Sequence, residues 1–179
     1  MIDLREPKEF LKDMLSIVIT IVAVILFIVY IGSIQQVLGP SMEPTLKEGD
    51  ILILNKIGYK LFDVKRFDIV AVKTKTSKYY VKRIIGLPGE KVEYINNVLF
   101  INEKAHKEEF LAKDTITENF SIKDLGYDTI PEDMYLVLGD NRINSEDSRD
   151  PKIGLIKKVD ILGKNSLRIF PFKNFGILE

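Results

Sequence analysis

The hydrophobic positions divide the chain into two parts of different character. The first part is one continuous apolar run over residues 14–34, in which 17 of 21 residues are apolar. No charged residue occurs between Asp13 and Glu43. A helix of about 20 apolar residues is long enough to cross the roughly 30 Å hydrocarbon core of a bilayer. The core of a cleavable signal peptide is shorter and precedes a small-x-small site, and the chain contains no Ala-x-Ala. The pattern therefore predicts a transmembrane anchor over residues 14–34.

The basic residues on either side of this run indicate its orientation. Arg5, Lys8 and Lys12 precede it, and the next basic residue in the chain is Lys47. Under the positive-inside rule, residues 1–13 are expected in the cytoplasm and residues 35–179 outside the membrane. The alternative is a buried core helix, but a soluble domain of this size rarely contains a helix that is apolar on every face.

The second part of the chain consists of short β-branched and aromatic runs between turn residues, a pattern typical of antiparallel strands. The Asn96-Asn97 pair predicts a tight hairpin turn, and Pro88-Gly89 predicts another turn. Residues 104–123 are polar and weakly patterned, which favours an exposed loop or excursion. We therefore predict a mainly β fold, an antiparallel and barrel-like domain on one N-terminal transmembrane helix. The predicted strands are residues 51–57, 67–74, 79–86, 91–95, 98–102, 134–139 and 160–170.

Composition limits the chemistry that this domain can perform. Cysteine is absent, which excludes disulfides, thiol nucleophiles and Cys-ligated metal. The single histidine, His106, lies among charged residues, so we interpret it as solvated rather than as a base or ligand. The 26 basic and 26 acidic residues give a net charge of zero, which argues against nucleic-acid binding. We expect no metal and no cofactor, and any catalysis must use Ser, Thr, Lys, Tyr, Asp or Glu.

The first candidate for catalysis is Ser41, which lies in the segment Gly-Pro-Ser-Met-Glu-Pro over residues 39–44. Two prolines and a glycine predict a rigid turn that holds the serine in a defined place. A serine hydroxyl is a weak nucleophile without a neighbouring base. Because histidine is scarce, a lysine is the plausible base, as in known serine–lysine pairs. Taken alone, however, Ser41 is most simply interpreted as an ordinary turn serine.

Lys82 is the candidate base, because strand alternation places it on one face with Tyr80 and Ile84. Burial on that face would lower its pKa. A fall of two units would make about 30% of the amine neutral at pH 8. The alternative is a solvated strand lysine.

A third stretch, residues 139–150, is dense in Gly, Asn, Asp and Ser and follows a predicted strand. That composition predicts a structured polar loop, whose hydroxyls and ion pairs could orient an amine. The competing interpretation is a solvated surface loop.

Together these stretches resemble the type I signal peptidases, membrane-anchored serine proteases that remove signal peptides from exported proteins. The segment SMEPTL matches the nucleophile motif SMxPTL of that family, and the other motifs follow in the same order. The resemblance extends from the anchor to about residue 170 and is closest to the short, single-span branch. The matching segments are residues 41–46, 49–53, 66–70, 82–90 and 139–149.

The resemblance implies a role for each site residue. Ser41 would be the nucleophile and Lys82 the general base. Ser145 would orient Lys82, and Asp147 with Arg149 would form a supporting ion pair. The chain departs from the family at Gly39, where some members carry a serine that assists the oxyanion hole. The Ser41 N–H and a backbone donor near Gly39 would then bind the oxyanion.

The implied function is cleavage of exported preproteins after a small-x-small motif, at the outer face of the plasma membrane. The implied partners are signal-peptide-bearing preproteins, the lipid bilayer and the export channel. Ser41 follows the apolar run by seven residues, which keeps it within about 25 Å of the membrane boundary. Candidate walls for the pockets that accept the small side chains are Ile34, Val37, Leu38, Met42 and the strand over residues 79–85.

Two other functions are compatible with parts of the sequence. A self-cleaving repressor-type protease shares the serine–lysine chemistry, but it needs a DNA-binding module and an Ala-Gly target, and this chain has no Ala-Gly. A non-catalytic, membrane-tethered binding module would explain the anchor and the strands. It does not require Ser41, Lys82 and the polar loop together.

Overall fold

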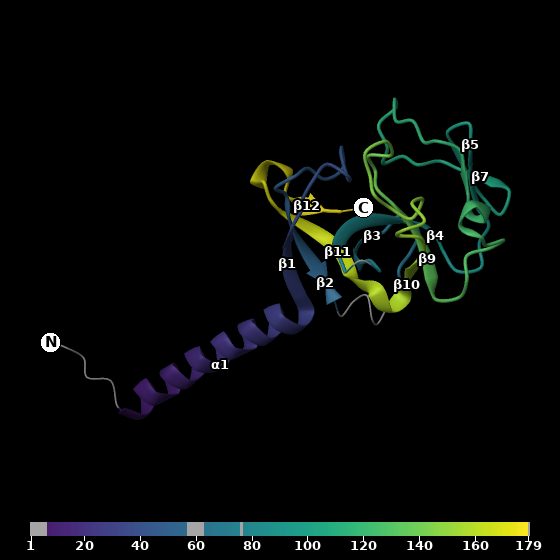
Figure 1. Ribbon diagram of the computed structural model, residues 1–179. Coiled ribbons are helices and arrows are strands. Elements are labelled where there is room, and N and C mark those ends of the chain that lie inside the picture. Colours follow the sequence, from purple (N-terminus) through teal and green to yellow (C-terminus); the bar gives the residue numbers. More distant parts are fainter. Residues whose placement is uncertain (1–6, 57–62, 76, 179) are drawn as a thin grey trace.

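The computed structural model describes residues 7–56, 63–75 and 77–178. The helix α1 (Pro7–Ile31) extends away from a β-rich body that contains the rest of the described chain (Figure 1). Strand β1 (Gly32–Gln36) follows the helix directly. Residues 32–34, predicted as the end of the apolar helix, therefore belong to a strand. Gly and Ser favour helices weakly, and all five residues of β1 gain partners by pairing with β2 (Ile51–Asn55).

The predicted anchor falls mostly within α1. The side chains of residues 8–25 are all exposed. Within the described residues, no helix combines the length and the apolar character that crossing a membrane requires. The anchor thus stays a prediction.

The larger sheet has the strand order β1-β2-β11-β3-β4-β9-β10, with β12 paired to β11. Every pair is antiparallel, and the sheet is curled (Figure 1). Each predicted strand is found, with ends shifted by at most two residues, although residue 57 lies outside the described residues. The further strands of this sheet are β3 (Ile69–Lys73), β4 (Tyr79–Gly86), β9 (Met134–Leu138), β10 (Ile156–Lys157), β11 (Ile161–Phe170) and β12 (Gly176–Ile177).

The smaller sheet has the order β7-β6-β5-β8. Asn96 and Asn97 have φ values of 49° and 68°, so the predicted hairpin turn between β5 and β6 is confirmed. Residues 104–123 contain β7 and β8, so the prediction of an exposed loop there is wrong in part. Strands of two or three residues are too short to reveal themselves by alternation. The bounds are β5 (Val92–Ile95), β6 (Val98–Ile101), β7 (Lys104–His106) and β8 (Phe120–Ser121).

Short 3₁₀ turns complete the described structure. They are η1 (Ile122–Leu125), η2 (Lys158–Asp160) and η3 (Phe172–Asn174).

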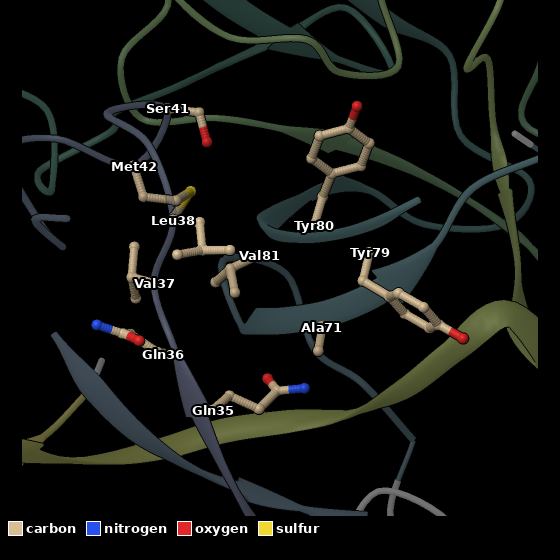
Figure 2. Close-up of a pocket in the computed structure, with 10 residues that line it drawn as sticks. All are labelled: Gln35, Gln36, Val37, Leu38, Ser41, Met42, Ala71, Tyr79, Tyr80 and Val81. Atoms are coloured by element: carbon tan, nitrogen blue, oxygen red, sulfur yellow. The ribbon is translucent and has the colours of Figure 1, made fainter. Parts of the chain in front are cut away.

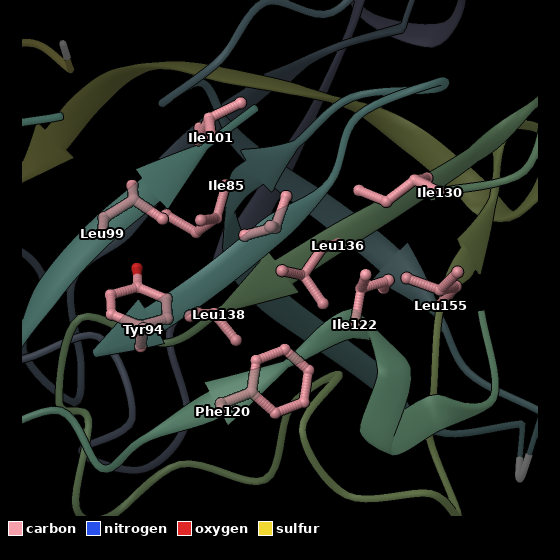
Figure 3. Close-up of a cluster of buried hydrophobic side chains, with 11 residues drawn as sticks. Ile85, Tyr94, Leu99, Ile101, Phe120, Ile122, Ile130, Leu136, Leu138 and Leu155 are labelled. Carbon is pink, nitrogen blue, oxygen red and sulfur yellow. The ribbon is translucent and has the colours of Figure 1, made fainter. Parts of the chain in front are cut away.

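Three clusters of buried apolar side chains stabilise the body. One fills the space between the smaller sheet and strands β4 and β9 (Figure 3). A second lies along β3, β9 and β11. The third lies beneath the turn that carries Ser41 and therefore fixes that turn on the sheet; it consists of Val37, Met42, Leu46, Leu52, Ile69 and Leu178.

Candidate active site

The Lys82 amine lies against the Ser41 hydroxyl. Its Nζ donates a hydrogen bond to Ser41 Oγ at 2.7 Å. Lys82 belongs to β4, which is paired on both sides, with β3 and with β9. Only 1% of Lys82 is exposed. The two residues proposed from the sequence as nucleophile and base are thus in contact.

Short-range hydrogen bonds shape the turn that carries Ser41. The Glu43 N–H donates to the Pro40 carbonyl at 3.0 Å, and the Leu46 N–H donates to the Met42 carbonyl at 2.9 Å. Met42 and Leu46 are fully buried. Met42 therefore packs in the core beside Ser41.

The polar loop over residues 139–150 holds the same turn from the other side. The Asn141 N–H donates to the Ser41 carbonyl at 3.1 Å, and Asn141 Nδ2 donates to the Pro40 carbonyl at 3.2 Å. Thr45 Oγ1 donates to Asp140 Oδ2 at 2.6 Å. The loop is therefore part of the site rather than a free surface loop.

The electrostatic setting of Lys82 favours its neutral form. Burial lowers the pKa of Lys82 from 10.5 to about 8, while the carboxylates of Asp147 and Glu146 partly oppose this fall. An amine with a pKa of about 8 is roughly half neutral at pH 8.

Tyr80 shields the amine on one side. Lys82 Nζ lies 5.2 Å from the centre of the Tyr80 ring. The Tyr80 hydroxyl donates to Glu146 Oε2 at 2.6 Å, and this bond raises the pKa of Tyr80 to about 12. The ring thus bridges β4 and the polar loop above the amine.

Asp140 fixes the beginning of the polar loop by pairing with Arg83. Both side chains are completely buried. Arg83 Nη2 donates to Asp140 Oδ2 at 2.8 Å, and Arg83 Nε donates to Asp140 Oδ1 at 2.9 Å. We did not predict this pair from the sequence. The sequence did contain an indication of such a pair: Arg83 lies in a strand of mostly apolar residues, and a buried guanidinium requires a carboxylate partner.

Arg142 ties the polar loop to the smaller sheet. Arg142 Nη2 donates to Glu108 Oε1 at 2.6 Å, and Arg142 Nη1 donates to the Tyr94 hydroxyl at 3.0 Å and to Thr117 Oγ1 at 3.1 Å. Arg142 Nε donates to the Gly139 carbonyl at 3.0 Å. Burial raises the pKa of Tyr94 well above its ordinary value. Sequence reasoning also missed this network.

Asp147 and Arg149 form an ion pair of 2.8 Å next to the site. Asp147 Oδ2 also accepts from the Gly139 N–H at 3.0 Å, and Arg149 Nη2 donates to the Arg142 carbonyl at 2.7 Å. The ion pair therefore holds both Gly139 and Arg142, the two ends of a segment that precedes Ser145.

Ser145 lies beside Gly139, where a Cβ at position 139 would come within 2.2 Å of Ser145 Oγ and 2.3 Å of the Ser41 carbonyl oxygen. The Ser145 hydroxyl is buried and has no hydrogen-bond partner among the described residues. The bond to Lys82 that the resemblance implied is therefore not formed in this structure.

The oxyanion donors proposed from the sequence lie at the start of the turn. Gly39 has a φ of +75°, a backbone conformation that suits glycine. The Ser41 N–H donates to no acceptor in the described part of the chain, so it is available to a ligand. Among the described residues, no three acidic or histidine side chains are grouped as a metal site.

A pocket of about 240 Å³ opens beside Ser41. Figure 2 shows the Ser41 hydroxyl directed toward the space between Leu38, Met42 and Tyr80. Ile34, a predicted wall, is absent from the lining and is 66% exposed. Of residues 79–85, only the first three contribute, because β4 enters the core beyond Val81. The lining residues are Gln35, Gln36, Val37, Leu38, Ser41, Met42, Ala71, Tyr79, Tyr80 and Val81.

Comparisons with known proteins place the chain among the signal peptidases. Residues 9–170 match the family model described as signal peptidase, peptidase S26. The chain is 42% identical to signal peptidase IB of Staphylococcus aureus, over 94% of this chain and 93% of that protein. It is 37% identical to signal peptidase I of Bacillus caldolyticus, over 82% of this chain and 84% of the relative. A crystal structure of a signal peptidase I from Enterococcus faecalis matches with a TM-score of 0.52 and 36% identity, covering 57% of this chain and 97% of that one.

Proposed function

The chain belongs to the signal peptidase family of serine peptidases, peptidase S26, and from this membership we propose that it cleaves signal peptides from exported preproteins by a Ser41–Lys82 mechanism. The observation that carries the proposal is the 2.7 Å contact between Lys82 Nζ and Ser41 Oγ, made by a lysine of which only 1% is exposed.

In the first step, neutral Lys82 accepts the Ser41 hydroxyl proton while Ser41 Oγ attacks the carbonyl carbon of the residue before the cut. The charge that develops on the carbonyl oxygen is stabilised by the Ser41 N–H, which has no other acceptor in the described chain. A donor in such a position is worth about 2.7–4 kcal/mol in the transition state. The Lys82 ammonium then gives its proton to the departing amine, which leaves an acyl-enzyme on Ser41.

In the second step, neutral Lys82 removes a proton from water while the water oxygen attacks the acyl carbon. The bond between that carbon and Ser41 Oγ then breaks, the Lys82 ammonium returns the proton to Ser41 Oγ, and the signal peptide leaves with a free carboxyl group. The low pKa of Lys82 supports both steps, because an amine with a pKa of about 8 both accepts and releases a proton near neutral pH.

We assign the supporting roles to residues of the polar loop. Asp147 and Arg149 would hold this loop in shape, which their ion pair supports. Ser145 would orient the Lys82 amine once a substrate excludes water, and its buried hydroxyl, which has no partner among the described residues, is available for such a bond. Gly39 would let the chain approach the oxyanion.

The pocket beside Ser41 would accept the small side chains that precede the cut. Its walls include Val37, Leu38 and Val81, and an apolar pocket of this size suits Ala-sized groups. Cleavage after a small-x-small motif would follow.

We further propose that residues 14–31, the part of the predicted anchor that lies in α1, anchor the enzyme in the plasma membrane, with residues 1–13 in the cytoplasm and the β domain on the outer face. The apolar sequence and the exposure of residues 8–25 support this topology. The pocket residue Gln35 follows α1 by only a few positions. An anchored enzyme would meet anchored preproteins in the same plane, which raises their effective concentration. Preproteins, lipid and the export channel would be its partners.

A direct test incubates the detergent-solubilised full chain with a reporter preprotein and sequences the new N-terminus of the product. We expect a cut after a small-x-small motif, and no product with Ser41→Ala or Lys82→Ala. Lys78→Ala is the matched control, because Lys78 lies just before β4 and its side chain is 64% exposed. Cleavage by Ser41→Ala at the wild-type rate would refute the proposal.

A further inference from the structure

A second depression adjoins the turn that carries Ser41. It has a volume of about 270 Å³ and shares no lining residue with the pocket beside Ser41. Three segments form its walls: Glu43 and Pro44 of the turn, residues from 112 to 116, and the polar loop over residues 140–143. We call it the Ile116–Ile143 groove.

Hydrogen bonds fix these three walls relative to one another. The Asn141 N–H binds the Ser41 carbonyl at 3.1 Å, which joins the polar loop to the turn. Arg142 Nη1 donates to Thr117 Oγ1 at 3.1 Å, which joins the polar loop to the wall that ends at residue 116. Asn97 Nδ2 donates to the Thr115 carbonyl at 3.0 Å and ties that wall to the β5–β6 hairpin. The groove is therefore formed before any ligand arrives.

The groove presents two aliphatic side chains to solvent. Ile116 is 60% exposed and Ile143 is 80% exposed. Neither side chain belongs to any of the buried clusters of the described body. Ile143 also lies in a loop whose other residues, over positions 139–150, are polar or glycine. An exposed aliphatic pair on rigid walls suits a ligand with an apolar side chain.

The groove also carries net negative charge. Asp140 is neutralised by Arg83, and Arg142 by Glu108. Glu43 and Asp114 form no ion pair with any described residue. A basic side chain would therefore be attracted to the groove, and an acidic one repelled.

We propose that the Ile116–Ile143 groove binds the first residues of the mature segment, after the cleaved bond, and favours aliphatic and basic side chains there. This inference rests on the proposed function. A peptide whose reacting carbonyl lies at Ser41 has its upstream residues in the pocket beside Ser41, so its downstream residues must leave across another face of the turn. The groove begins at Glu43, two positions from the nucleophile, and contains the loop that binds the Ser41 carbonyl.

The test compares two reporter preproteins with the same signal peptide and cleavage motif. They differ only within about the first five residues of the mature segment, which span roughly 17 Å when extended. One carries Leu and Lys there, and the other carries Ser and Glu. We expect the wild type to cleave the Leu/Lys substrate with a kcat/KM about tenfold higher.

Two variants then report on the groove separately. Asp114→Lys should reduce the preference for the Leu/Lys substrate by roughly two- to fivefold, because it replaces attraction of the substrate lysine with repulsion. Ile143→Ser should reduce the same preference by several-fold, because it removes an apolar contact to the substrate leucine. The matched controls lie outside the groove: Asp128→Lys, whose carboxylate is 95% exposed, and Val159→Ser, whose side chain is 84% exposed. Both controls should keep the wild-type preference.

The outcomes separate this inference from the proposed function. If the wild type cleaves both substrates equally well, or if groove and control variants behave alike, the groove does not bind the mature segment. A preference that changes with enzyme concentration would point to a second copy of the chain in the groove and would also overturn it. If the wild type cleaves neither substrate, the proposed function itself fails.

Discussion

Lys82 Nζ lies 2.7 Å from Ser41 Oγ, although 41 positions separate the two residues in the chain. The contact depends on two independent supports. Strand β4 is paired on both sides and fixes Lys82 within the sheet. The turn that carries Ser41 is held from below by Met42 and Leu46 and from the side by Asn141. A change in either support is therefore expected to affect catalysis without removing a reacting group.

Replacing Lys82 with Met should inactivate the enzyme and stabilise the fold. The folded state lowers the pKa of Lys82 from 10.5 to about 8, so burying the charged form costs about 3 kcal/mol below pH 8. Between about pH 8 and 10.5 the unfolded chain binds this proton and the folded chain does not. The wild type should thus gain stability relative to Lys82→Met as the pH rises through that window.

Urea denaturation at pH 7 and at about pH 10.5 measures this difference. Lys78→Met, at an exposed position, should show no such pH dependence. A wild type that is more stable than Lys82→Met at pH 7 would contradict the expected cost of burial.

Replacing Gly139 with Ala should damage the site by steric means alone. The added Cβ would lie 2.2 Å from Ser145 Oγ and 2.3 Å from the Ser41 carbonyl oxygen, so the turn or the loop must move. A displacement of about 1 Å at a reacting group can reduce the rate 100-fold. The kcat/KM of Gly139→Ala should fall by about that factor. Gly176→Ala, where nothing lies within 4 Å of the new Cβ, should retain wild-type activity, and equal activity of the two variants would count against the observed contact.

Replacing Glu108 with Gln should destabilise the protein strongly. Glu108 accepts from Arg142 at 2.6 Å, and the two side chains are 7% and 0% exposed. Removing the carboxylate leaves a buried guanidinium without its counter-charge, which costs about 3–5 kcal/mol. Thermal unfolding should show a large fall in Tm. The neighbouring Glu109→Gln is the control, because the Glu109 side chain is 78% exposed and its loss should change the Tm little. Similar Tm values for the two variants would mean that the network does not contribute.

Replacing Ser145 with Ala tests whether its hydroxyl orients the general base. The hydroxyl has no partner in the described chain, so its loss should not lower the free energy of unfolding. If it binds Lys82 in the complex with substrate, kcat should fall by about tenfold or more while KM changes little. Unchanged kcat would remove Ser145 from the mechanism.

The local features of the fold were predictable from the sequence. A β-branched and aromatic run predicted β4 over its full length, and the Asn96-Asn97 pair predicted the hairpin turn between β5 and β6. The strands β7 and β8 were missed because two or three residues carry no periodic signal. The end of α1 was predicted three residues too late, because Ile34 extends the apolar run, whereas Gly32–Gln36 forms β1 and pairs with β2.

Residues of the candidate site could be predicted where a local sequence pattern points to them. They could not be predicted where the site depends on contacts between distant segments. Ser41 and Lys82 were singled out by the turn motif and by strand alternation, and the structure brings them together. The partners of Arg142 come from two other segments, at Glu108 and Tyr94. No local pattern connects such positions, so only the tertiary structure reveals that the smaller sheet supports the polar loop.

The most direct test of the mechanism is the pH dependence of kcat/KM for a reporter preprotein, which reports the pKa of the base in the free enzyme. Because burial lowers the pKa of Lys82 to about 8, kcat/KM should rise about tenfold per pH unit below pH 8 and level off above it. A rate that stays constant from about pH 6 to 9, or one that rises only near the pKa of an ordinary lysine at about 10.4, would contradict Lys82 as the buried general base.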